Sequence, residues 1–560
     1  MWAVLQEPCD ENIVRSAPQT APCAKPRGRW ILAATILATS MAFIDSTAVN
    51  VALPALQANL NATAVDVQWV IEAYSLLLSA LLLVGGSLGD HYGRRRVFLI
   101  GIALFAFASA ACGLAANIHQ LIAARALQGL GAALLVPGSL AIISSSFSED
   151  QRGRAIGTWS GFSAITTAIG PVMGGWLIEH VSWRAVFFIN IPLAALVILI
   201  SFWRVPESSD PESAGLDWLG AALAALGLGA LVYGLIESSR LGFNDRSVLA
   251  ALTAAVALLA LFVMTERHVP NPMLPLALFR SRIFTGTNVL TFLLYAALGG
   301  TLFFLPLNLI QVQHYSATAA GAALLPFILI ISLLSRWSGG LVTSYGPKRP
   351  LVIGSLTVAS GYFLFMLPTM GGSYWINFFP PVVVLGLGMA ISVAPLTTTV
   401  MNSVPENHAG IASGVNNAVA RTAGLIAIAV LGIVMLHVFN RALDERVTQS
   451  NLPASVMRSL QMQRTKLAAI AIPEDQDTAT QQQIRGAIDE SFVSGFRVVM
   501  VIGAALAVAS AVTALLWIEA AYGHRTRADT RRSRRMRSRS VRGVKYPADV
   551  QKASARSSQI

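Results

Sequence analysis

Three charged side chains occupy positions where their neighbours in the sequence are apolar. Asp45 lies in the segment FIDSTAVNVALP, Glu72 follows the apolar residues around Val70, and Arg125 begins the segment RALQGLGAA. Two chemistries suit such groups. A carboxyl group can take up and release a proton, and a carboxylate can pair with a guanidinium. Both depend on the elements that hold the three side chains.

The composition indicates an integral membrane protein. Of the 560 residues, 54% are hydrophobic and 12% are charged, whereas soluble domains carry about 25% charged residues. Apolar stretches of about 20 residues, the length that crosses a bilayer, recur along the chain up to Glu519. No soluble fold requires such repeated stretches, so a water-soluble protein is excluded.

These stretches predict an all-α membrane protein with about fourteen transmembrane helices. Helices are required because lipid offers no partners to backbone polar groups. A β-barrel is excluded because the stretches are continuously apolar rather than alternating. The expected spans are residues 30–53, 67–88, 96–116, 120–146, 155–179, 184–204, 216–237, 247–266, 284–310, 317–343, 350–369, 376–402, 410–439 and 494–519.

The basic residues predict the orientation of the spans. Fourteen Lys and Arg residues lie in the short connections on one side and three on the other, and the side rich in them is normally cytoplasmic. Both termini are then cytoplasmic. The segment after Gly523 carries +10 of the net charge of +12. We interpret it as a cytoplasmic tail near anionic lipid headgroups, and we expect no specific nucleic-acid partner.

A repeat relates the two halves of the chain. Residues 86–96 read GSLGDHYGRRR and residues 339–349 read GGLVTSYGPKR, and both follow an even-numbered span. Matching loops on one side of the membrane predict two parallel halves of six helices with two extra helices between them, as in many transporters. The expected regions are an N-terminal segment (1–29), a first half (30–204), a linker with two spans (205–283), a second half (284–520) with an external loop (440–493) containing a helix-like stretch (461–470), and a basic tail (521–560).

The depths of the charged residues predict an ion pair. At about 1.5 Å per residue, Asp45, Glu72 and Arg125 lie at similar depth towards the outer side. We expect Arg125 to reach Asp45 directly or through water. If a conformational change alters this contact, Asp45 can load a proton on one side and release it on the other; a static structural pair is the alternative. Arg421 lies midway along the thirteenth expected span, where a functional and a structural role remain open.

The motifs support neither ATP as the energy source nor an enzymatic activity. The phosphate-binding pattern G-x-x-x-x-G-K-[ST] does not occur in the sequence, so ATP is not the expected drive and no cofactor is expected. The eight histidines are scattered without metal-ligand spacing, which disfavours a membrane enzyme. A proton that moves inward across 100 mV supplies about 2.3 kcal/mol. A non-transporting sensor that signals through the basic tail is a further alternative.

Five segments in order resemble the fourteen-span drug:proton antiporters of the major facilitator superfamily. DSTAVNVALP (45–54) is similar to the first-helix signature of that family, GSLGDHYGRRR to its loop 2–3 motif, and RALQGLGAA to its fourth-helix motif. GPVMGG (170–175) resembles the antiporter motif of helix 5, and WRAVFFINIPLA (183–194) resembles the segment that opens helix 6. The resemblance covers roughly residues 30–520 and implies the major facilitator fold.

The resemblance implies roles for particular residues. It implies proton coupling by Asp45, Arg125 and Glu72, and Glu72 could also attract cationic substrates. The expected substrate path is formed by Phe43, Trp69, Tyr74, Arg421, Asn416 and Asn417; the cytoplasmic gate by Gly86, Asp90, Gly93, Arg94 and Arg95; and the antiporter motif by Gly170, Pro171, Gly174 and Gly175.

The implied function is efflux of amphiphilic, cationic or polyspecific drug-like compounds in exchange for protons, by alternating access. The alternative is a dedicated exporter of a natural product, a lipid or another metabolite. The expected location is a bacterial cytoplasmic membrane, and the expected partners are a small-molecule substrate, protons and the lipid bilayer. A monomeric state is compatible with this architecture.

Overall fold

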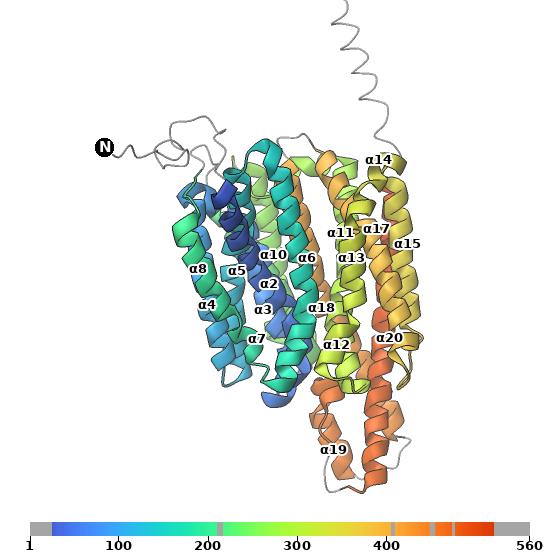
Figure 1. Cartoon of the computed structure of the whole chain (residues 1–560). Coiled ribbons are helices and arrows are strands. Elements are labelled where there is room, and N and C mark those ends of the chain that lie inside the picture. The colour runs from blue at the N-terminus through green and yellow to red at the C-terminus, as the bar shows by residue number, and fades with distance from the viewer. Residues whose placement is uncertain are drawn as a thin grey trace, which may run out of the picture.

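A computed structural model describes residues 25–209, 217–270, 272–404, 409–448, 454–472 and 476–519. Every regular element within these residues is a helix (Figure 1). The expected N-terminal segment lies mostly, and the basic tail entirely, outside the described residues.

The first part of the chain forms seven helices. They are α2 (Lys25–Asn59), α3 (Ala64–Tyr92), α4 (Arg94–Leu114), α5 (Ile118–Ser146), α6 (Glu149–His180), the short α7 (Ala185–Phe188) and α8 (Asn190–Arg204). Helix α5 packs along α3 and α4, and α2 packs against α6 and α8. Two further helices follow, α9 (Trp218–Leu241) and α10 (Arg246–His268), which pack against each other.

The remaining helices form the second group in Figure 1. Helices α11, α15, α17, α18 and α20 pack on one another, and α13 packs on α17. The elements are η1 (Leu276–Arg280), α11 (Arg282–Leu307), η2 (Asn308–Val312), α12 (Ala317–Ala323), α13 (Leu325–Gly339), α14 (Leu341–Tyr345), α15 (Lys348–Phe365), α16 (Tyr374–Asn377), α17 (Phe379–Asn402), α18 (Ala409–Thr448), α19 (Ala454–Met462), η4 (Arg464–Ala469) and α20 (Thr478–Trp517).

The helices agree with the expected all-α membrane architecture. Thirteen helices in the described residues are long and apolar enough to cross a membrane. The expected span 350–369 corresponds to α15, which has 18 residues and begins with Lys348 and Arg349. At about 1.5 Å per residue, a helix of this length is close to the thickness of the hydrocarbon core. Fourteen spans are therefore consistent with this structure.

The repeated loops have matching backbone turns. Gly93 joins α3 to α4 with φ +105°, and Gly346 stands between α14 and α15 with φ +73°. These conformations favour glycine because a side chain would be strained there. The two copies of the motif therefore end their spans in the same way.

Helices α9 and α10 are placed at the boundary between the two groups. Helix α9 packs on α3 from the first group and on α18 from the second. An apolar cluster fills this junction, with Val65 and Leu76 of α3, Val232 of α9, and Leu425 and Ala429 of α18. The extra pair therefore covers the line along which α3 meets α18.

The segment expected as an external loop is mostly helical. Helix α18 continues to Thr448, α20 starts at Thr478, and α19 protrudes beyond the bundle with them (Figure 1). The helix-like stretch expected at 461–470 is wrong in its boundaries, because α19 ends at Met462 and a 3₁₀ turn follows. Leu467 has φ +53° and is buried in this turn. Its backbone conformation is incompatible with a continuous α-helix.

Candidate functional site

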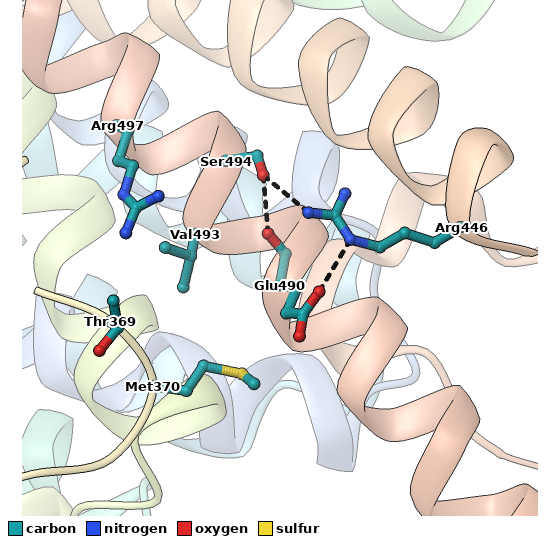
Figure 2. A pocket seen from close by; sticks show the side chains of 7 residues that line it. All are labelled: Thr369, Met370, Arg446, Glu490, Val493, Ser494 and Arg497. Carbon is teal, nitrogen blue, oxygen red and sulfur yellow. Dashed lines mark hydrogen bonds and ion pairs between the residues drawn. The ribbon is translucent and has the colours of Figure 1, made fainter.

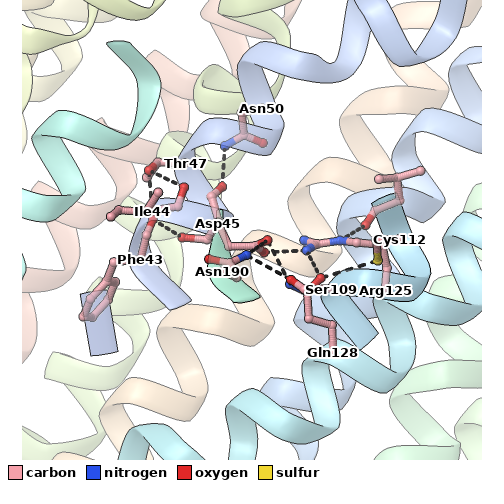
Figure 3. A network of polar contacts seen from close by, with 12 residues as sticks. Phe43, Ile44, Asp45, Thr47, Asn50, Ser109, Cys112, Arg125, Gln128 and Asn190 are labelled. Carbon is pink, nitrogen blue, oxygen red and sulfur yellow. Dashed lines mark hydrogen bonds and ion pairs between the residues drawn. The ribbon is translucent and has the colours of Figure 1, made fainter. Parts of the chain in front are cut away.

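Asp45 and Arg125 form a buried ion pair. Nη1 of Arg125 lies 2.5 Å from Oδ2 of Asp45, and the two side chains are 1% and 0% exposed, respectively (Figure 3). Helix α2 carries the carboxylate and α5 carries the guanidinium. The direct contact agrees with the depths that the sequence predicted for both residues. Neither group faces lipid, as expected for charges inside a membrane.

Three amide and hydroxyl side chains extend this pair into a network. Nε2 of Gln128 donates to Oδ1 of Asp45 at 2.9 Å, and Oε1 of Gln128 accepts from Arg125 at 2.7 Å. Nδ2 of Asn190 lies 3.3 Å from the same Asp45 oxygen. Both amides also donate to Ser109, at 2.8 and 2.9 Å. Four helices, α2, α4, α5 and α8, thus meet at one carboxylate.

Arg125 is held from its other side by α3. Its Nε donates to the backbone carbonyl of Val70 at 3.0 Å. Its guanidinium carbon lies 4.3 Å from the centre of the Tyr74 ring, a distance at which a cation is attracted to an aromatic face. Since these contacts do not involve Asp45, they can hold the guanidinium when Asp45 is protonated.

Tyr74 connects this network with the second half of the chain. Its phenol group lies within electrostatic range of Asp45 and Arg125, and also of Arg421 on α18. Arg421 is similarly near Tyr295 on α11. The deep arginine of the second half and the ion pair of the first half therefore both lie within electrostatic range of Tyr74.

Glu72 does not join the ion pair. It is 0% exposed, and neither carboxylate oxygen has a hydrogen-bond partner in the described residues. The neighbouring Trp69 on α3 contacts α9: its indole Nε1 donates to Oε1 of Glu237 at 3.1 Å, and its ring lies 6.2 Å from that of Tyr233. Both acceptor and ring belong to α9.

The other residues expected along the substrate path are dispersed. Phe43 is partly buried on α2 and points away from the ion pair in Figure 3. Nδ2 of Asn416 donates to Thr291 at 2.6 Å and to Asn288 at 3.2 Å, which joins α18 to α11. Asn417 is exposed and donates to the backbone of Ser413 within its own helix.

The expected cytoplasmic gate forms contacts within the first half and with Glu207, just after it. Nε of Arg94 lies 2.8 Å from Oδ1 of Asp90. The backbone N–H of Arg95 donates to Oε1 of Glu207 at 3.0 Å. Gly86 lies near Pro137 of α5, and a Cβ on Gly93 would stand 2.7 Å from Glu207. We call this end of the bundle, which carries Arg94 to Arg96, the arginine end, and the opposite end the α19 end.

The glycines of the antiporter motif lie where α6 meets other helices closely. A Cβ on Gly170 would come within 2.0 Å of Thr47, and one on Gly174 within 2.7 Å of Ala48, both on α2. A Cβ on Gly175 would come within 2.4 Å of the Ala317 carbonyl, at the start of α12 in the second half. Pro171 lies inside α6 beside these positions. The glycines of the motif therefore lie at close helix contacts.

The two halves are joined by polar contacts at the α19 end. Nε2 of Gln311 donates to Gln57 at 2.9 Å, and Gln57 donates to the backbone carbonyl of Lys466 at 3.0 Å. Glu179 of α6 accepts from the backbone and hydroxyl of Thr318 at 2.7 Å each. Towards the arginine end, no atom of the described residues lies within 4 Å of a Cβ built at Gly153, Gly157 or Gly161 of α6. The contacts therefore close the α19 end and leave this face of α6 open.

A polar cavity of about 340 Å³ lies at the α19 end of the second half (Figure 2). It is lined by Arg446, Glu490, Ser494, Arg497 and the loop residues Thr369 and Met370. Nε of Arg446 lies 3.0 Å from Oε2 of Glu490, so this arginine is already neutralised by an acid of α20.

Reasoning from the sequence did not single out Gln128, Asn190 or Ser109. Gln128 lies three residues after Arg125, which places it on the same face of a helix. Asn190 is the amide residue among the apolar residues of the segment AVFFINIPLA. Polar side chains inside spans were thus a usable signal, but the hydrogen bonds of Gln128 and Asn190 to Asp45, and of both to Ser109, depend on how four helices pack.

Comparison with known proteins places this arrangement in context. The chain matches the Major Facilitator Superfamily over residues 35–428. It is 34% identical over 510 residues to the tetracenomycin C resistance and export protein of Streptomyces glaucescens, with 88% of this chain and 93% of that protein covered. It is 33% identical over 493 residues to the multidrug resistance protein Stp of Mycobacterium tuberculosis, with 85% and 89% covered.

Solved structures show the same fold at much lower identity. A bacterial homolog of the human lysosomal transporter Spinster, in an inward-facing and occupied conformation, matches with a TM-score of 0.61 and 15% identity, over 88% of this chain and 97% of that one. The xylose transporter XylE of E. coli matches with a TM-score of 0.54 and 15% identity, over 88% and 97%.

Proposed function

This chain belongs to the Major Facilitator Superfamily, and from that premise we propose that it exports amphiphilic drug-like compounds, cationic ones included, in exchange for protons. It is a multi-pass membrane transporter rather than an enzyme. We place it in a bacterial cytoplasmic membrane with the arginine end towards the cytoplasm, because the basic connections gather at that end.

The observation that carries the proposal is the buried carboxylate of Asp45 in contact with Arg125. Burying a carboxylate at this depth costs free energy unless a cation pairs with it. Protonation removes the charge that Arg125 compensates, while Arg125 keeps its contacts with Gln128 and the Val70 carbonyl. Proton binding therefore loosens α2 from α5 without leaving a buried guanidinium free of partners.

The loosening of α2 from α5 on proton binding would act through alternating access. In the structure the α19 end is closed by contacts such as Gln57–Gln311, and substrate would enter from the arginine end. Tyr74, whose ring lies 4.3 Å from the guanidinium carbon of Arg125, is also within electrostatic range of Arg421 in the second half. A proton entering from outside and leaving inside would move down its gradient, supplying about 2.3 kcal/mol per 100 mV. The proton gradient is thus the proposed drive.

The test uses purified protein in liposomes loaded with a fluorescent cationic drug. A pH gradient should drive transport by the wild type, and Asp45→Asn should abolish it while drug exchange without a gradient continues. Glu445→Gln removes an exposed carboxylate at the α19 end and serves as the control. Gradient-driven transport by Asp45→Asn at the wild-type rate would remove Asp45 from the coupling step.

A dedicated exporter of one natural product is the second candidate. The relative that is 34% identical over nearly the whole chain is a tetracenomycin C resistance and export protein, whose name specifies one compound. The dedicated and the polyspecific exporter are distinguished by expressing the protein in a host that lacks its own efflux pumps and measuring drug resistance. Resistance to a single structural class supports the dedicated exporter, and resistance to unrelated amphiphiles supports the polyspecific one.

A further inference from the structure

The polar cavity at the α19 end carries an arginine that no acid of the described residues neutralises. Arg446 pairs with Glu490 at 3.0 Å, whereas Arg497 of α20 forms no ion pair within the described residues. Two arginines and one glutamate are the charged residues that line the cavity, which leaves it a net charge of +1. Figure 2 shows the guanidinium of Arg497 pointing towards the loop that carries Thr369 and Met370.

The guanidinium of Arg497 is also short of hydrogen-bond acceptors. Its Nη2 donates to the backbone carbonyl of Pro368 at 3.3 Å, which is longer than is usual for such a bond. Its Nε is buried and has no partner within the described residues. A buried donor without an acceptor costs free energy. Arg497 therefore has the capacity to bind a further acceptor, and its uncompensated charge favours a negative one.

The cavity lies at the level of the lipid headgroups. Arg497 stands three residues inside the expected span 494–519, which is about 5 Å below the end of that span. The loop between α15 and α17 lines one side of the cavity, and its most exposed apolar side chains are Leu367 (70%), Trp375 (68%) and Ile376 (77%). Tryptophan is enriched where the bilayer meets water. With the arginine end in the cytoplasm, as proposed above, this is the outer leaflet.

We propose that this cavity binds the headgroup of an anionic phospholipid, with its phosphate at Arg497 and its acyl chains along the exposed apolar side chains of the α15–α17 loop. Phosphate oxygens suit a guanidinium because they accept two parallel hydrogen bonds from it. The volume of about 340 Å³ lies in the range of small-molecule sites. The bound headgroup joins α20 to the loop. The site goes beyond the proposed transport function, since it assigns the protein a lipid ligand.

Free inorganic phosphate offers the same oxygen atoms and is the competing source of the ligand. Two features favour the lipid. A bilayer holds headgroups at this level permanently, so less translational freedom is lost on binding than for a free ion. The exposed apolar side chains of the loop gain burial only from acyl chains. Among lipids, phosphatidylglycerol has a net negative charge, whereas phosphatidylcholine carries its own cation and compensates Arg497 less.

The test uses delipidated full-length protein in detergent. Native mass spectrometry counts the phosphatidylglycerol molecules bound during a titration, and phosphatidylcholine and inorganic phosphate are the comparison ligands. Arg497→Gln removes the charge, and Arg497→Lys keeps it without the planar fork of donors. Arg458→Gln is the matched control, because Arg458 is exposed on α19 and does not line the cavity.

A second variant fills the cavity without changing its charge. Thr369 is an exposed residue of the cavity wall, so Thr369→Phe should block the headgroup from the loop side. Thr397→Phe is its control, since Thr397 is exposed on α17 and lies outside the cavity. Size-exclusion profiles and melting temperatures identify a variant that fails to fold. If Arg497→Gln does so, Thr369→Phe and the comparison of ligands still decide.

The wild type should bind phosphatidylglycerol about tenfold or more tighter than phosphatidylcholine. Arg497→Gln and Thr369→Phe should each weaken this binding by about tenfold or more, as expected for a lost charged contact or a blocked site. Arg497→Lys should bind with intermediate affinity, and both controls should bind as the wild type does. Wild-type affinity in Arg497→Gln or Thr369→Phe, or equal binding of the two lipids, would overturn the proposal. Inorganic phosphate that binds as tightly as phosphatidylglycerol would overturn the assignment to a lipid.

Discussion

Nη1 of Arg125 lies 2.5 Å from Oδ2 of Asp45, although 80 positions separate the two residues in the chain. The contact spans two helices of the first half and is excluded from both lipid and water. Breaking a buried pair by removing one partner typically costs about 3–5 kcal/mol, because the other charge stays buried. The stability of this half therefore depends in part on one contact.

Arg125→Ala should destabilise the protein more than the double variant Asp45→Asn with Arg125→Ala. The single change leaves a buried carboxylate without its cation, whereas the double change removes both charges. Melting temperatures in detergent provide the measurement. A double variant that melts below Arg125→Ala would show that the ion pair is not the main source of the loss.

Gln128→Leu should shift the pH profile of transport towards more alkaline pH. Gln128 donates a hydrogen bond to the charged form of Asp45 at 2.9 Å, and losing a donor disfavours that form relative to the protonated one. Gln120→Leu is the control, since Gln120 is exposed near the start of the same helix. The shift is measured as the transport rate of each variant over a series of external pH values. An unchanged profile in Gln128→Leu would exclude this amide from tuning the carboxyl group.

Gly174→Val should abolish transport while Gly157→Val is tolerated. Both glycines lie on α6, but a Cβ on Gly174 would come within 2.7 Å of Ala48, whereas nothing lies within 4 Å of one on Gly157. Overpacking of a close helix contact typically costs about 1–3 kcal/mol. The two variants are compared by the efflux of a fluorescent substrate from intact cells. The efflux is normalised to the amount of protein in the membrane. Equal activity would mean that α2 and α6 need not approach closely.

Gln57→Ala should favour opening at the α19 end. The change removes hydrogen bonds to Gln311 and to the Lys466 carbonyl, and each such bond contributes about 0.5–1.5 kcal/mol. Because two bonds are lost, the open population should rise about fivefold or more. Spin labels at His119→Cys and Ser373→Cys report the distance between the halves at this end.

The matched control for this change is Gln461→Ala, an exposed glutamine on α19. The same distance distribution in Gln57→Ala and in the control would show that these contacts do not hold the α19 end closed.

Gly93→Ala should lower the melting temperature. Gly93 has φ +105°, and a Cβ there would lie 2.7 Å from Oε1 of Glu207. A side chain at positive φ costs about 1–2 kcal/mol, and Glu207 would have to leave the backbone N–H of Arg95. Gly153→Ala on α6, with nothing within 4 Å, should leave the melting temperature unchanged or higher. Equal values in both variants would contradict the strain at Gly93.

The sequence by itself determined the membrane class, the spans, the repeat and the depth of the charged residues. Hydrophobic length and helical rise are local properties, so Asp45 and Arg125 could be assigned to one level before any packing was known. The glycine turns at Gly93 and Gly346 also follow from local backbone chemistry. Domain boundaries and the roles of the site residues stay predictions.

Only the tertiary structure decided which polar groups meet. Depth alone placed Glu72 at the level of Asp45 and Arg125, yet in the structure its carboxylate oxygens have no hydrogen-bond partner among the described residues. Gln128 and Asn190 converge on Asp45 because α5 and α8 pack on α2 at particular angles. Helix rotation and packing depend on contacts between residues far apart in the chain, and a hydrophobicity pattern along one helix does not contain that information.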